Sequence, residues 1–108
     1  MSINKDVTFA LKNIGVPVSF QTYSGNEETY ITFFTYLDKP EEHADDEESV
    51  TAYYVQVDIW TKTDYTNLAK EVHGCMLIAH FRKLNFYDLF EDDTRTYHKV
   101  MRFIKEVI

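Results

Sequence analysis

The side chains with the clearest potential for chemistry are the carboxylates of one stretch, DKPEEHADDEES, at residues 38–49. This stretch carries a net charge of −6 from seven acids and one lysine, whereas the whole chain of 108 residues carries −7. Three roles fit such a segment: a cation site, a solvated insert, or a surface that faces another negatively charged molecule. The seven carboxylates are Asp38, Glu41, Glu42, Asp45, Asp46, Glu47 and Glu48.

A tight calcium site is not expected in this stretch. An EF-hand loop turns at a glycine and ends in a bidentate glutamate, and residues 38–49 contain no glycine. The stretch also lacks any apolar residue larger than alanine to anchor it, and its like charges repel one another. The sequence therefore predicts an acidic, mobile loop at 38–49, with no metal site and no cofactor.

The histidines and the single cysteine are a second place to look for a site. On a helix, His73 and His80 would lie on one side but two turns apart, about 10 Å along the axis, which is too far for one metal ion. His73 and Cys75 would point about 200° apart. We therefore prefer a structural role for all three. One cysteine also excludes an intrachain disulfide and fits a reducing compartment.

Motifs for catalysis and phosphate binding are absent from the sequence. It contains no P-loop, dinucleotide-binding turn, nucleophile elbow or paired CxxC, and only three glycines. We therefore expect no catalytic residue and no enzymatic activity. The eleven Lys and Arg residues are scattered singly, which argues against tight binding to duplex DNA. Because no apolar run approaches ~20 residues, we expect a soluble, non-exported protein without membrane contact.

The elements that position these residues begin with a short helix and two strands. Apolar residues recur at helical spacing over residues 4–14, and Gly15 ends that segment. Residues 16–23 and 29–37 are rich in β-branched and aromatic side chains and flank the turn SGNE, which predicts a β-hairpin. The apolar helix face consists of Val7, Ala10, Leu11 and Ile14.

The rest of the chain predicts a strand, a long helix and a second hairpin. The strand VTAYYVQVDIWT alternates between an apolar and an amphipathic face. A helix over 64–84, begun by Thr63 or Asp64, precedes a hairpin with Asp92 and Asp93 near its turn. The order α-β-β-β-α-β-β predicts one α+β domain over residues 1–108, with a mainly antiparallel sheet, a short N-terminal helix and one long helix packed on it. The two strand faces are Tyr53, Val55, Val57 and Ile59, and Tyr54, Gln56, Asp58 and Trp60.

This pattern resembles the tail-terminator, or tail-to-head joining, proteins of long-tailed bacteriophages and prophages. The resemblance rests on YYVQVDIWT, the helix directly after it and FYDLFEDDTRTYHKVMRF. The N-terminal helix running into GVPV and the strand YITFFTYL follow in the same order as in that family. The resemblance therefore covers most of the chain.

The resemblance implies a structural virion protein that forms a ring, commonly a hexamer, at the head-proximal end of the tail after assembly in the host cytoplasm. Implied partners are further copies of the chain, the tail tube protein and the head connector or stopper protein. DNA would pass through the ring only as cargo. A monomer in isolation is compatible with this role, because ring closure can need the tail end as a template.

The resemblance also implies roles for individual residues. Val55, Val57 and Ile59 would form the subunit scaffold. Tyr54 and Trp60 are candidate ring contacts, and alanine at either is expected to leave the fold intact. The carboxylates of 38–49 would face the lumen, where they would repel DNA phosphates; a plain solvated loop is the alternative.

Two other functions stay open at this point. The first is another neck, connector or minor capsid component of the same virion. The second is an acidic inhibitor that imitates DNA, which is less favoured because a mimic spreads its carboxylates over a rigid surface. All three functions lack catalysis.

Overall fold

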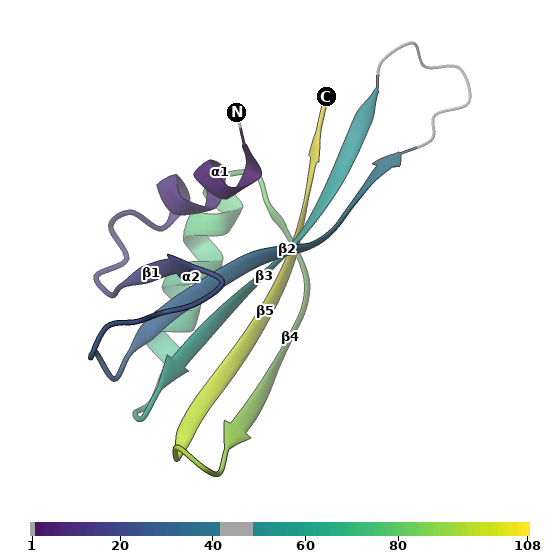
Figure 1. Ribbon diagram of the computed structural model, residues 1–108. Coiled ribbons are helices and arrows are strands. Elements are labelled where there is room, and N and C mark those ends of the chain that lie inside the picture. The colour runs from purple at the N-terminus through teal and green to yellow at the C-terminus, as the bar shows by residue number, and fades with distance from the viewer. Residues whose placement is uncertain (1, 42–48) are drawn as a thin grey trace.

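Two helices lie on one face of a five-stranded sheet in the computed structural model, which describes residues 2–41 and 49–108 (Figure 1). The sheet order is β1-β2-β3-β5-β4, and every neighbouring pair is antiparallel except β1 and β2. The predicted α+β class and element order are confirmed. The elements are α1 (Ile3–Ala10), β1 (Val18–Phe20), β2 (Tyr30–Glu41), β3 (Val50–Thr61), α2 (Thr66–Ile78), β4 (Arg82–Glu91) and β5 (Thr96–Val107).

The core fills the space between the helices and the sheet. The predicted helix over residues 4–14 is too long, because α1 ends at Ala10. On its predicted apolar face, Val7, Leu11 and Ile14 are buried and Ala10 is partly buried. The inward-facing residues Val55, Val57 and Ile59 of β3 are also buried. Fully burying each such side chain contributes ~1.5–3 kcal/mol, so this cluster holds the two layers together. The cluster consists of Val7, Leu11, Ile14, Ile31, Phe33, Val55, Val57, Ile59, Val72, Met76, Phe81, Met101 and Phe103. Neither described helix has the length and apolar character of a membrane span.

The first two strands do not form the predicted hairpin. The expectation for residues 16–23 and 29–37 is wrong, because the three-residue β1 runs parallel to β2. Gln21, directly after β1, has a positive φ of 61°. The nine residues 21–29 then return the chain to the end of the sheet at which β1 began. SGNE therefore belongs to a longer connection and not to a tight hairpin turn.

The second helix is shorter than the predicted helix over 64–84 and ends at Ile78. His80 adopts a left-handed φ of 72°, and the N–H groups of His80 and Phe81 donate to carbonyl oxygens of the last helical turn, at 3.0 Å each. This pair of bonds is a Schellman motif. Because His80 lies beyond the helix, the predicted placement of His73 and His80 on one helix face is wrong.

The helix begins at Thr66 with Tyr65 as its N-cap residue, so the prediction that Thr63 or Asp64 begins it is wrong. Asp64 nevertheless binds the first turn. Its carboxylate accepts hydrogen bonds from the hydroxyl and the amide of Thr66, at 2.6 and 2.9 Å. These two bonds hold the pKa of Asp64 below its ordinary value. They also satisfy one of the amides that the first turn of a helix leaves without a partner.

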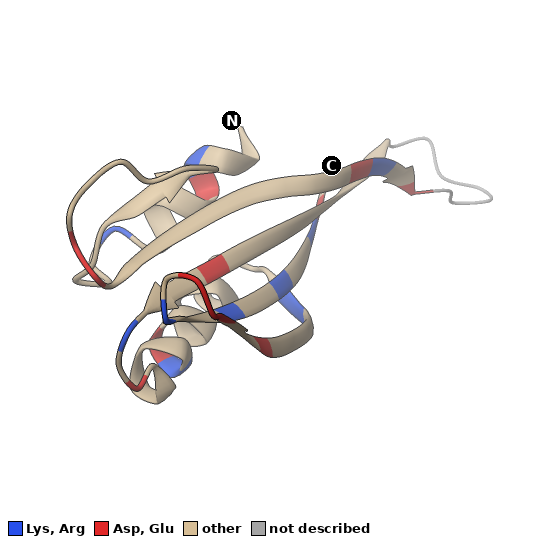
Figure 2. Cartoon of the chain, turned by 60° about the horizontal axis from the view of Figure 1, so that its bottom comes forward, with Lys and Arg blue, Asp and Glu red and all other residues tan. Residues whose placement is uncertain are grey.

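The outer parts of β2 and β3 extend beyond the helices as an arm (Figure 1), and residues 105–107 of β5 pair with residues 51–53 of β3 at its base. Residues 38–41 were expected in a loop, but they belong to β2 and pair with residues 50–53 of β3. The pairing of β2 with β3 has a register shift between Thr35 and Leu37 and then continues to Glu41. The remainder of the predicted loop, residues 42–48, lies outside the described residues. Charged residues of both signs are spread over the body and the arm (Figure 2).

Candidate functional site

The first face of β3 packs with the helices in the core cluster, so its second face lies on the side of the sheet that carries no helix. It is amphipathic, as predicted, yet its polar residues are not solvated. Asp58 is 3% exposed and Gln56 is 9% exposed. His98 of β5, which is 7% exposed, lies beside Asp58. This face therefore holds a buried polar layer without help from a helix.

A chain of hydrogen bonds connects this layer across β3 and β5. Arg102 Nε donates to Gln56 Oε1 at 3.0 Å, and Gln56 Nε2 donates to Asp58 Oδ1 at 2.8 Å. The same Asp58 oxygen lies 2.7 Å from His98 Nε2. Glu91 of β4 approaches the other ring nitrogen of His98, with 3.6 Å between Oε1 and Nδ1. These contacts compensate the burial of a carboxylate, which is otherwise costly.

The two predicted ring contacts lie on this face but are not brought together. Tyr54 and Trp60 are six residues apart on β3, about 20 Å at ~3.3 Å per residue. Trp60 is half-buried, stacks on His98 at 3.7 Å between ring centroids and donates to Thr32 Oγ1 at 2.9 Å. Tyr54 lies nearer the arm, with Lys39 Nζ 5.7 Å from its ring. Only Trp60 is built into the polar layer.

One edge of the sheet is formed by β4, which pairs with β5 alone. Nine of its ten residues are exposed, and Phe86 is half-buried. Four large apolar side chains are among the exposed residues. They are Leu84 (41%), Tyr87 (36%), Leu89 (45%) and Phe90 (41%). The backbone groups on the outer side of this strand have no neighbouring strand among the described residues.

A second free edge belongs to the outer part of β2. The short strand β1 covers only residues 31–33. Farther along, Tyr36 is 37% exposed and Leu37 is 44% exposed. In the described ranges, the sheet thus has two open edges of different sequence.

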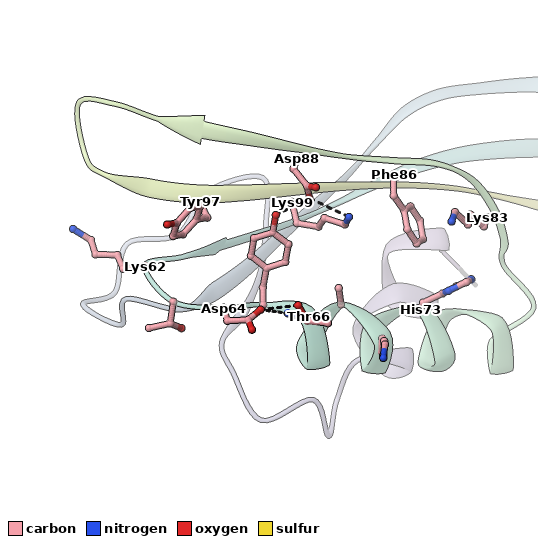
Figure 3. A pocket seen from close by; sticks show the side chains of 13 residues that line it. Lys62, Asp64, Thr66, His73, Lys83, Phe86, Asp88, Tyr97 and Lys99 are labelled. Atoms are coloured by element: carbon pink, nitrogen blue, oxygen red, sulfur yellow. Dashed lines mark hydrogen bonds and ion pairs between the residues drawn. The ribbon is translucent and has the colours of Figure 1, made fainter.

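An open cavity of about 760 Å³ lies between the start of α2 and the β4–β5 hairpin (Figure 3). Within it, the Tyr65 hydroxyl donates to Asp88 Oδ1 at 2.6 Å, and Lys99 Nζ lies 3.0 Å from the same oxygen. Burial, followed by the Asp88 carboxylate, raises the pKa of Tyr65 to about 12. Hydrogen bonds from Tyr65 and Lys99 lower the pKa of Asp88. The lining residues are Lys62, Thr63, Asp64, Tyr65, Thr66, Ala69, Lys70, His73, Lys83, Phe86, Asp88, Tyr97 and Lys99.

Two of the seven carboxylates expected to face a lumen are described. Asp38 is exposed and Glu41 is half-buried, and both lie in the arm. Their role at a lumen stays a prediction. The other five, Glu42, Asp45, Asp46, Glu47 and Glu48, lie outside the described residues.

Three features of the surface were missed by sequence reasoning. The edge position of β4 follows from the strand order, which a hairpin pattern alone does not reveal. The pairing of Asp58 with His98 joins residues 40 apart in the chain. The cavity depends on how the hairpin sits against α2. A usable signal was the density of apolar residues in NFYDLF, which is higher than a strand with one solvated face requires.

Comparison with known proteins identifies the fold. No protein-family model matches the chain, and no curated protein matches it in sequence. Its structure is similar to that of a chain in a solved structure described as the virion of a native gene transfer agent (GTA) particle, with a TM-score of 0.62. The match covers 98% of this chain and 94% of that chain, at 12% sequence identity. At this identity, the similarity shows a shared fold.

Proposed function

We propose that this protein is a non-catalytic structural component of a phage-type virion. In this proposal it forms a ring, commonly hexameric in proteins of this pattern, at the head-proximal end of the tail. The ring ends the tail tube and joins it to the head connector, and DNA passes through it. Two observations support the proposal: the resemblance of the sequence pattern to tail terminators, and the shared fold with a chain of a GTA virion over nearly its whole length.

The single observation that carries the proposal is the open edge at β4. A long free edge with exposed apolar side chains is a template for pairing with another chain, and proteins that stay monomeric usually blunt such edges. The other open edge, on the outer part of β2, has a different sequence. A contact between unlike edges is heterologous, and heterologous contacts close into a ring when the rotation between neighbours fits.

Replacing Leu89 by lysine tests the role of this edge. A charge there should prevent close approach of a neighbouring strand, as edge lysines do in natural sheets. Leu77→Lys is the matched control, because Leu77 is 49% exposed on α2 and Leu89 is 45% exposed on β4. Sedimentation velocity and negative-stain images should show rings, alone or on purified tail ends, for the unmodified protein and for Leu77→Lys. Undiminished rings for Leu89→Lys would exclude the β4 edge from the contact.

The position in the virion needs a separate experiment. If the ring ends the tail tube, particles made without this protein should contain tails of uncontrolled length. If the protein is instead another neck or minor capsid component, tails of normal length should accumulate without heads. Electron microscopy of the particles separates these two outcomes.

A further inference from the structure

The cavity between α2 and the β4–β5 hairpin concentrates positive charge in an acidic protein. Its lining includes four lysines and two carboxylates, a net charge of +2, whereas the whole chain carries −7. The four lysines are Lys62, Lys70, Lys83 and Lys99, and the carboxylates are Asp64 and Asp88. The four exposed apolar side chains of the β4 edge, Leu84, Tyr87, Leu89 and Phe90, are not among its lining residues.

Both carboxylates of the cavity already have partners, whereas three of the four lysines form no ion pair among the described residues. One of these three, Lys62, donates to the backbone carbonyl of Thr94. Asp88 binds Tyr65 and Lys99, as described above, and Asp64 accepts hydrogen bonds from Thr66 in the first turn of α2. Lys70 of α2 and Lys83 of β4 are exposed and form no ion pair within the part of the chain that the structure describes. These two lysines, on opposite walls, are therefore available to a ligand with carboxylates.

Aromatic rings contribute apolar surface to the cavity, with Phe86 near Lys83 and Tyr97 at the opposite end (Figure 3). Phe86 is half-buried, and Tyr97 is 43% exposed (Figure 3). His73 meets Phe86 at 83° with 5.2 Å between ring centroids, and Lys83 Nζ lies 4.2 Å from the Phe86 ring. Tyr65 and Tyr97 are tilted by 60°. The rings therefore do not present parallel faces.

We propose that this cavity binds an acidic peptide segment of a partner protein, with an apolar side chain flanked by Asp or Glu. The apolar side chain would enter beside Phe86, and the flanking carboxylates would pair with Lys70 and Lys83. A cavity of about 760 Å³ lies in the ~300–1,000 Å³ range of sites for small ligands, so only a few residues enter it. This inference does not depend on ring formation.

A nucleic acid suits this cavity less well. Single-stranded chains bind in cationic grooves with aromatic faces on which successive bases stack. Here the rings are tilted, and Lys99 is already engaged by Asp88. A phosphate at every nucleotide would also meet the two carboxylates of the lining. A peptide can instead place its few charges at the lysines.

The acidic arm of the same subunit does not reach the cavity. Strand β3 begins at Val50 in the arm and ends at Thr61, next to the cavity residue Lys62. Its twelve residues span about 36 Å at ~3.3 Å per residue. The described part of the arm and the cavity thus lie at opposite ends of this strand, and the ligand proposed here is a segment of another protein.

Binding of defined peptides to the full-length protein tests this proposal. The probe is a fluorescein-labelled peptide, Glu-Glu-Leu-Phe-Glu-Glu, followed by fluorescence anisotropy. We expect saturable binding that weakens as salt screens the charges. The double variant Lys70→Glu/Lys83→Glu should bind roughly tenfold more weakly, because two exposed charge contacts become repulsive. Circular dichroism should show that this variant stays folded.

Matched controls separate the cavity from general charge effects. The variant Lys5→Glu/Lys12→Glu changes the charge equally at exposed positions that do not line the cavity, and it should retain the affinity of the unmodified protein. The peptide with Gln in place of Glu should not bind. Three results would overturn the proposal: no binding of the acidic probe at low salt, equal weakening in both double variants, or tighter binding of hexathymidylate. A fourth is tighter binding of a peptide of residues 38–49, which would make a second copy the ligand.

Discussion

His98 Nε2 lies 2.7 Å from Asp58 Oδ1, and both side chains are more than nine-tenths buried on the face of the sheet that carries no helix. The pair joins β5 to β3 and continues to Gln56 and Arg102. A buried carboxylate is tolerated only when hydrogen bonds or charges compensate it. This pair therefore explains how an uncovered sheet face keeps an ordered polar layer.

The variant Asp58→Ala should be less stable than the unmodified protein. It leaves His98 and Gln56 buried without their shared acceptor, which costs about 1–3 kcal/mol. Urea unfolding can be followed through the fluorescence of Trp60, the chain's one tryptophan, which stacks on His98. Asp38→Ala, at an exposed position, should change the free energy of unfolding by less than ~0.5 kcal/mol. Equal effects of the two substitutions would contradict this role of Asp58.

Alanine at Trp60 and at Tyr54 should have different effects. Trp60→Ala removes the stack on His98 and the hydrogen bond to Thr32, so the free energy of unfolding should fall by about 2 kcal/mol, less than for a fully buried tryptophan. Tyr54→Ala should cost less than ~1 kcal/mol and should instead impair ring formation. The expectation that alanine leaves the fold intact is therefore kept for Tyr54 alone. Thermal unfolding and negative-stain images measure the two effects separately.

The carboxylate of Asp88 should make stability depend on pH in the acid range. Its folded pKa is lowered by Tyr65 and then by Lys99, so the ionised form contributes stability above the unfolded pKa of ~3.9. That contribution is lost as the pH falls through the lower, folded pKa. The melting temperature of Asp88→Asn should therefore be below that of the unmodified protein at pH 6, and the difference should vanish at the acid end. Tyr65→Phe should reduce the difference, and a difference that grows toward acid pH would contradict the assignment.

Local periodicity was sufficient to predict most of the fold. The spacing of Val7, Leu11 and Ile14, and the alternation of Val55 and Val57, are signals of burial, and these residues are buried. The end of α2 was missed because glycine usually occupies the left-handed position of a Schellman motif, and His80 occupies it here. The direction of β1 was missed because it depends on the path of the chain after Phe20.

The surfaces were less predictable than the core, because they depend on which strands become neighbours. The alternation of β3 placed Asp58 opposite the core correctly, but nothing near it in the chain indicates its partner His98. The apolar residues of β4 were consistent with the predicted hairpin strand, and their pattern did not indicate that they would be exposed. Their exposure follows only from the position of β4 at the edge of the sheet. Sequence patterns indicate which side of a strand is apolar, whereas the pairing of the strands determines which elements cover that side.

Neutralising the acidic segment tests the lumen-facing role that the family resemblance implies. Six substitutions to Gln or Asn remove six negative charges, and assembly should be unaffected because the scaffold of β3 is unchanged. If the segment lines the channel, DNA ejection should slow, most visibly at ~0.01 M salt, where the Debye length is ~30 Å, against ~10 Å at 0.1 M. The substituted residues are Glu41, Glu42, Asp45, Asp46, Glu47 and Glu48.

A matched control removes six exposed carboxylates outside residues 38–49 and should leave ejection unchanged at every salt concentration. These are Glu27, Glu28, Glu71, Asp92, Asp93 and Glu106. Ejection rates from purified particles, measured with a DNA-binding dye, compare the two variants. Failure of the first variant to join heads to tails would place the segment in an interface between proteins. Normal joining together with normal ejection at both salt concentrations would leave it a solvated insert, because a channel lining that repels phosphates must act most strongly where screening is weakest.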